Sequence, residues 1–194
     1  MPLTNNIDTP PDAGAVAERL ARALDERGQD YALDGAIALG YWAEPRGTHD
    51  VDVTLFLPQE KPSECVWLLQ EIGCELNATD AVASLQEHGF CRIVCDSPRV
   101  DVFVPIIPFY ELARQRRRRV PLGQHQVMVW DAETLTVFKM MFFRRKDIVD
   151  VEQIMHVQGS ALNRNWIREQ LLDMYGARDA RLAQWDELAN EVTP

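Results

Sequence analysis

Residues 46–58 read RGTHDVDVTLFLP, and this stretch decides the fold. From Val51 to Leu57 the sequence alternates and is rich in β-branched and aromatic residues, which predicts a strand that Pro58 closes. Because strand side chains repeat every two residues, Asp50 and Asp52 point to one face, about 7 Å apart along the chain. Two carboxylates so placed suit a shared divalent cation, although aspartates at a strand mouth can also be simply solvated.

A second predicted strand carries another carboxylate. Phe90 to Cys95 and Val100 to Val104 flank residues 96–98, Asp-Ser-Pro, and the pattern is typical of a β-hairpin. Alternate residues of the second strand are valines, so Asp101 lies on the face opposite to an apolar surface.

Two interpretations of Asp101 stay open at this stage. It pairs with Arg99 or Arg92 within the sheet, or it faces Asp50 and Asp52 across adjacent strands. Three unpaired carboxylates in one place repel one another, so such a cluster persists mainly when cations bind it. Oxygen ligands favour Mg²⁺ or Mn²⁺ over zinc.

The rest of the chain predicts an α+β fold, in which a small mixed β-sheet with helices precedes a C-terminal helical bundle. Residues 1–11 are polar and proline-bearing, which predicts a flexible N-terminal tail. Residues 12–130 mix helix and strand patterns and form the predicted core. Residues 131–194 predict helices, the first of them capped by Asp131.

Charge is distributed unevenly along the chain. The net charge is −10, which counts against a general nucleic-acid-binding surface. Five arginines nevertheless fall within residues 114–119. This run is either an edge-strand face or solvated loop, or a surface that receives a nucleic acid or nucleotide.

Neither a secretory leader nor an apolar run of the roughly 18 residues that a membrane span requires is present, so we expect a cytoplasmic protein without a membrane partner. In that setting cysteines stay reduced. We therefore interpret all four as free thiols, buried in the core rather than bound to zinc; they are Cys65, Cys74, Cys91 and Cys95.

The order of these motifs resembles that of the nucleotidyltransferase superfamily related to polymerase β. Residues 33–35, Leu-Asp-Gly, stand where that family has a glycine-rich turn, and residues 46–52 match its R-x-T-x-D-x-D run. Residues 139–150 resemble the branch of minimal, AbiEii-type nucleotidyltransferases that includes abortive-infection toxins. The resemblance covers roughly residues 30–157.

The resemblance implies a role for each matched residue. Asp50, Asp52 and Asp101 would be the catalytic, metal-binding carboxylates, with Asp101 also helping to deprotonate the attacking hydroxyl. Four further residues would bind the nucleotide: Gly35, Arg46, Thr48 and Lys139.

The sequence departs from the family pattern at Asp34, which replaces the first glycine of the turn. This extra carboxylate is unfavourable beside a triphosphate, but it can instead cap a helix that begins at Gly35. Asp147 suits the first turn of a helix, whereas the role of Asp150 stays open. Trp42 is interpreted as a packing residue that is near enough to the predicted site to stack on a base.

The resulting hypothesis is a magnesium-dependent enzyme that moves a nucleoside monophosphate from a nucleoside triphosphate to a hydroxyl acceptor. The toxin-like resemblance implies RNA, tRNA in particular, or a protein side chain as acceptor, and an antitoxin as partner. An aminoglycoside-type small molecule is an alternative acceptor, because an acidic protein suits a cationic substrate. A second alternative is a catalytically silent binding module that acts as an antitoxin or scaffold.

Overall fold

The computed structural model describes residues 12–95 and 98–191, so the predicted tail and the turn residues 96 and 97 lie outside the described part. Its centre is a six-stranded mixed sheet in the order β3-β4-β2-β1-β6-β5. The strands are β1 Tyr31–Leu33, β2 Asp50–Leu55, β3 Phe90–Val94, β4 Arg99–Phe103, β5 Arg118–Leu122 and β6 His125–Val129.

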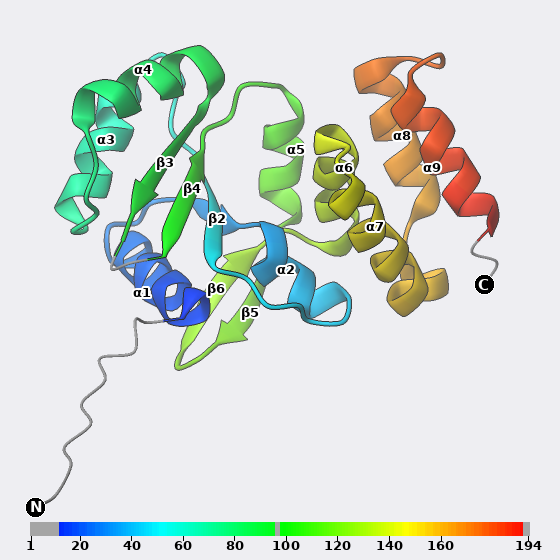
Figure 1. Ribbon diagram of the computed structural model, residues 1–194, viewed down its shortest axis with the longest axis horizontal. Coiled ribbons are helices and arrows are strands. Elements are labelled where there is room, and N and C mark those ends of the chain that lie inside the picture. Colours follow the sequence, from blue (N-terminus) through cyan, green and yellow to red (C-terminus); the bar gives the residue numbers. More distant parts are fainter. Residues whose placement is uncertain (1–11, 96–97, 192–194) are drawn as a thin grey trace, which may run out of the picture.

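Helices pack around this sheet and extend beyond it (Figure 1). Helices α6 to α9 gather on one side of the sheet, where α6 contacts α7, α8 and α9. The helices are α1 Ala13–Glu26, α2 Gly35–Trp42, α3 Pro62–Glu71, α4 Ala78–His88, α5 Phe109–Arg116, α6 Ala132–Phe142, α7 Arg145–Gln158, α8 Arg164–Tyr175 and α9 Ala180–Glu191. The predicted α+β class with C-terminal helices is confirmed.

Several local predictions are also confirmed. The side chain of Asp12 accepts a hydrogen bond from Ala15 N at the start of α1, and Asp131 accepts one from Thr134 N at the start of α6. Such caps satisfy backbone N–H groups that have no partner within the helix. The hairpin prediction holds as well, because β3 pairs with β4 antiparallel.

The sequence patterns did not indicate α4 or α5, and they indicated β5 only as one interpretation of the arginine run. Within α4 only Ala81 and Leu85 are buried, so its apolar stripe is too thin to be recognised. Strand β5 contains Pro121 and three of its five positions are exposed, which suits its place at the edge of the sheet.

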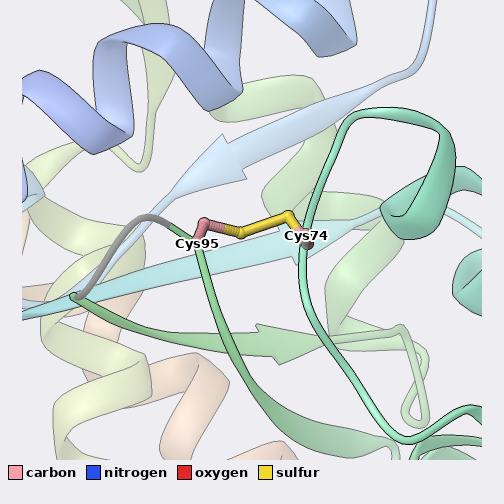
Figure 2. Close-up of a disulfide and its surroundings, with 2 residues drawn as sticks. All are labelled: Cys74 and Cys95. Atoms are coloured by element: carbon pink, nitrogen blue, oxygen red, sulfur yellow. A yellow bond between two sulfur atoms is a disulfide. The ribbon is translucent and has the colours of Figure 1, made fainter.

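The prediction that all four cysteines are free thiols is wrong for one pair. Cys74 and Cys95 form a disulfide (Figure 2). Their neighbours Glu75 and Val94 form an isolated antiparallel bridge, which brings the two Cα atoms to 4.8 Å from each other. The two segments are 21 residues apart in sequence, and sequence patterns alone do not predict this pairing. The other two cysteines are free and buried, as expected.

One hydrophobic cluster runs from the sheet into the C-terminal helices. It includes Val51 and Val53 of β2 together with Leu135 of α6 and Ile167 of α8. No helix within the described ranges combines the length and apolar character that a membrane span requires.

Candidate active site

The three predicted carboxylates come from two adjacent parallel strands. Val51 and Val53 of β2 are fully buried, so Asp50 and Asp52 lie on the opposite face. Strand β4 pairs with β2 in a register that places Asp101 beside Asp52. The sheet therefore brings the three carboxylates to one face, as one of the two interpretations of Asp101 expected.

Two arginines on the same face bind two of these carboxylates. Arg92 donates two hydrogen bonds to Asp101, at 2.7 and 2.8 Å, and Arg99 donates to Asp50 at 3.0 and 3.5 Å. The other interpretation, an ion pair within the sheet, thus also holds for Asp101. Both arginine side chains are more than half exposed, at 52% and 55%. Exposed pairs of this kind contribute at most about 1 kcal/mol, so a competing ligand displaces them at small cost.

Asp52 differs from its neighbours because no ion pair neutralises its carboxylate within residues 12–95 and 98–191. The pKa of Asp52 is raised to about 7. Burial is the largest cause, followed by the negative charges of Asp34 and Asp101, and the positive charges of Lys139 and Lys146 offset these effects only in part. A carboxylate short of positive charge is a natural ligand for a cation.

Gly35 stands against Asp52 at the start of α2. Its φ of +59° is in the left-handed region, and a Cβ atom there would lie 1.8 Å from Oδ2 of Asp52. The glycine is therefore needed to admit the aspartate. Asp34 is the N-cap of α2, and its Oδ1 accepts the Gly35 N–H at 2.6 Å. The capping role expected for Asp34 is confirmed, and this N–H is already bonded.

Lys139 is only 4% exposed, so its side chain is not a solvated surface lysine. Its Nζ lies 2.7 Å from Oδ2 of Asp150. The Asp150 carboxylate also accepts two hydrogen bonds of 3.0 Å from Arg46, one at each oxygen. Burial tends to raise the pKa of Asp150, but the hydrogen bonds from Arg46 and Lys139 outweigh it and hold the pKa below its usual value. The three residues form a charge cluster joining α6, α7 and the α2–β2 loop.

Thr48 and Asp147 hold local backbone structure. The Thr48 hydroxyl lies 3.0 Å from Asp50 O and 3.2 Å from Asp50 N, so it fixes the start of β2. Asp147 is buried and accepts the Arg144 N–H at 3.1 Å in a capping box at the start of α7, the structural role expected for it.

Two pockets share part of their lining, which includes Asp52, Asp101 and the basic side chains of Arg92, Lys139 and Arg144. The first, of about 300 Å³, is the basic pocket. Its basic side chains outnumber its carboxylates, which makes it locally positive in an acidic protein; they are Arg46, Arg92, Arg99, Lys139, Arg144 and Lys146. The second, of about 400 Å³, is the aromatic pocket. Its aromatic side chains are Phe90, Phe103, Tyr110, Phe138, Phe142 and Tyr175.

The arrangement of elements is that of known nucleotidyltransferases. Two structures of the antibiotic-resistance factor ANT(2'')-Ia match, each at 13% sequence identity. A solution structure matches with TM-score 0.58 over 92% of this chain and 97% of that chain. A complex with adenylyl-2''-tobramycin matches with TM-score 0.56 over 84% of this chain and 98% of that chain. The lincomycin-bound lincosamide adenylyltransferase LnuA matches with TM-score 0.51 at 10% identity, over 74% of this chain and 96% of that chain. The chain has a nucleotidyltransferase fold. No protein-family model and no curated protein matches the sequence.

Within this nucleotidyltransferase fold, the chemistry of the carboxylates suits a divalent cation. All the candidate ligand atoms are oxygens, and within the described residues Asp52 forms no ion pair. In the described ranges no group of three or more His, Cys, Asp or Glu side chains is arranged to hold an ion, and arginines pair with Asp50 and Asp101. The chemistry of these oxygen ligands thus fits a divalent ion, although in this structure the three carboxylates do not enclose one.

The arginine run is mostly used in internal ion pairs. Arg114 and Arg117 bind Asp30, and Arg116 binds Asp131 at 2.7 Å. The predicted edge-strand location holds for the last two arginines of the run, which lie in β5. These contacts account for the first part of the run without a nucleic-acid ligand.

Trp42 and the aromatic pocket depart from what the sequence suggested. Trp42 donates from Nε1 to Trp130 O at 2.8 Å and is absent from the lining of both pockets, which agrees with a packing role. The aromatic wall was missed. A usable signal was present in β4, where Phe103 follows Asp101 on the same strand face.

Proposed function

We propose that this chain is a magnesium-dependent nucleotidyltransferase that moves a nucleoside monophosphate from a nucleoside triphosphate to a hydroxyl group. The observation that carries the proposal is the placement of Asp50, Asp52 and Asp101 on one face of two paired strands, beside the start of α2. The fold supports it, because the lincosamide adenylyltransferase LnuA and ANT(2'')-Ia, the latter in complex with adenylyl-2''-tobramycin, share it.

In this proposal Asp50 and Asp52 hold Mg²⁺ or Mn²⁺, and Asp101 completes the ligand set. When bound, the ion neutralises triphosphate charge and makes the α-phosphorus more electrophilic. Asp101 accepts the proton of the attacking hydroxyl, which lies within reach of the same strand face. Pyrophosphate leaves as the new P–O bond forms.

The basic pocket supplies the phosphate contacts. Lys146 is exposed at its edge, and Arg99 is free to bind phosphate oxygens once it releases Asp50. Lys139 and Arg46 hold the base of the pocket through Asp150 and add positive potential there. Thr48 and Gly35 act by shaping the backbone next to the carboxylates.

The acceptor proposed from the toxin-like resemblance is an RNA, such as tRNA, or a protein side chain, with an antitoxin as partner. A small-molecule acceptor is the second candidate. It is favoured by the structural neighbours, one bound to an adenylylated aminoglycoside and another to lincomycin. A catalytically silent binding module is the alternative that is not an enzyme. The observation that favours it is that Asp50 and Asp101 already form ion pairs with arginines.

The test is incubation of the purified chain with each α-labelled nucleoside triphosphate, Mg²⁺ and either total RNA or a panel of small alcohols and aminoglycosides. Label that enters an acceptor with the native chain and not with Asp50→Ala/Asp52→Ala establishes the transferase. Absence of transfer, together with absence of Mg²⁺-dependent nucleotide binding, selects the silent module instead. The matched control is Asp186→Asn, which alters an exposed ion pair of α9 remote from both pockets.

A further inference from the structure

The two pockets of the site differ in chemistry, because one is rich in basic side chains and the other in aromatic side chains. We infer that the acceptor is a neutral small molecule that bears both the reacting hydroxyl and an aromatic or similarly flat apolar group, and that this apolar group binds in the aromatic pocket. The inference rests on the proposed function and narrows it to one class of acceptor.

Three kinds of side chain follow one another along one face of strand β4. Arg99, Asp101 and Phe103 alternate along it, so a basic group, a carboxylate and an aromatic ring follow one another at steps of about 7 Å. On strand β3, Arg92 pairs with Asp101 and Phe90 with Phe103, so the aromatic rings of the two strands lie at the same end. The basic and aromatic pockets therefore extend in opposite directions from the same carboxylate.

This order matches the direction of the reaction. In phosphoryl-type transfer the attacking and leaving oxygens lie roughly in line on opposite sides of the phosphorus. Pyrophosphate, which carries the charge, belongs in the basic pocket at the Arg99 end. The attacking hydroxyl then approaches Asp101 from the Phe103 end, where its O–P bond forms as the α–β bridging P–O bond breaks and its proton passes to the carboxylate.

The wall of the aromatic pocket is a set of rings in contact. Phe90 and Phe103 have centroids 5.1 Å apart, and Phe103 meets Phe142 edge-on at 6.0 Å. Phe142 is 45% exposed and Ile106 is 48% exposed, although both line the pocket. Large apolar groups left in water around a concave site mark a surface that a ligand covers.

Charge argues against a polycationic acceptor in this pocket. Of its lining carboxylates, Asp101 is bound to Arg92 and Asp147 to Arg144. Asp34 is buried and its Oδ1 is engaged by the Gly35 N–H, and Asp52 belongs to the proposed metal site. Among the described residues, the wall of this pocket therefore has no carboxylate left to bind an amine of the acceptor.

Size and charge argue against a polymeric acceptor. A volume of about 400 Å³ is within the range of small-ligand pockets and far below what an RNA helix needs. The net charge of −10 repels a polyanion, and Arg114, Arg116 and Arg117 of the basic run are already paired.

The first experiment uses N-phenyl-1-naphthylamine, a neutral probe that fluoresces in apolar pockets, with the full chain. We expect it to bind the native chain and the Trp67→Ala control, which removes an aromatic side chain 63% exposed on α3. We expect Phe142→Ala to weaken binding about tenfold, because a ring of the wall is lost. Equal probe binding by Phe142→Ala and the native chain, or no binding at all, overturns the inference.

The second experiment separates the acceptor from the nucleotide. Calorimetry with Mg²⁺ and α,β-methylene analogues of the four nucleoside triphosphates tests the proposed function by itself. We expect an analogue to bind without displacing the probe and with equal affinity for Phe142→Ala. Displacement of the probe by the analogue assigns the pocket to the nucleoside base and overturns the inference, whereas probe binding without analogue binding overturns the proposed function.

The third experiment measures transfer from the α-labelled nucleotide to four acceptors: 4-nitrophenyl β-glucoside, glucose, kanamycin and total tRNA. We expect kcat/KM for the aryl glucoside to exceed that for each of the others at least tenfold. Phe142→Ala should raise KM for the aryl glucoside about tenfold and leave kcat within about twofold. Preferred labelling of kanamycin or tRNA, or no labelling of the aryl glucoside although the analogue binds, overturns the inference.

Discussion

Replacing Asp52 by asparagine should stabilise the metal-free protein at alkaline pH. Burial, reinforced by the charges of Asp34 and Asp101, raises the pKa of Asp52 from 3.8 to about 7. Asparagine keeps the shape and removes the charge. At about 1.36 kcal/mol per pKa unit, the three-unit shift corresponds to about 4 kcal/mol of unfolding free energy.

The sign follows from where the proton is held. Because the folded-state pKa lies above the unfolded value of about 4, the folded chain keeps a proton that the unfolded chain releases. The stabilising contribution of protonated Asp52 is complete below about pH 4 and is lost as the pH rises to about 7. The advantage of Asp52→Asn over the native chain should therefore be near zero at about pH 4 and largest above about pH 7.

The assay is urea unfolding of both chains at several pH values with a chelator present. Asp50→Asn is the matched control on the same strand face. Asp50 is half exposed and paired with Arg99, so its replacement should change the unfolding free energy by less than about 1 kcal/mol. An Asp52→Asn protein no more stable than the native chain at about pH 8 would refute the reasoning.

Three further predictions concern stability. Gly35→Ala should lower the unfolding free energy by about 1 to 3 kcal/mol, because the backbone is left-handed and the new methyl collides with a carboxylate; an unchanged melting temperature would contradict this. Asp150→Asn should cost about 3 kcal/mol by leaving two cations short of a counter-charge, against less than about 1 kcal/mol for exposed Asp186→Asn; equal urea midpoints would contradict this. Replacing Cys74 and Cys95 by serine should cost about 3 kcal/mol, since the bond closes a loop of 21 residues, and a native midpoint that does not change on reduction would count against the disulfide.

Local patterns were sufficient for much of the fold. The alternation of β2 and the valines of β4 depend only on which face of a strand is buried, and both strands were found from the sequence. The caps Asp12 and Asp131 likewise act within four residues of themselves. Such short-range rules need no knowledge of the tertiary structure.

Features that join segments far apart in the sequence could not be predicted from sequence patterns. The burial of Lys139 depends on Asp150 and Arg46, two segments that an isolated helix pattern does not bring together. The Cys74–Cys95 bond depends on an isolated bridge between two other segments. Strand periodicity predicted which strand face carries each carboxylate, and Arg92 was one of the two partners considered for Asp101, but the pairing of Asp50 with Arg99 depends on strand register.

The cluster of Lys139, Asp150 and Arg46 also bears on how the chain can be divided. It joins the region predicted as residues 12–130 to the region predicted as 131–194 through ion pairs between partly exposed Arg46 and the buried Asp150–Lys139 pair. A chain cut after residue 130 would leave Arg46 in one piece and its partner in the other. We expect the two halves to behave as a split protein, in which nucleotide binding returns only when the fragments reassociate.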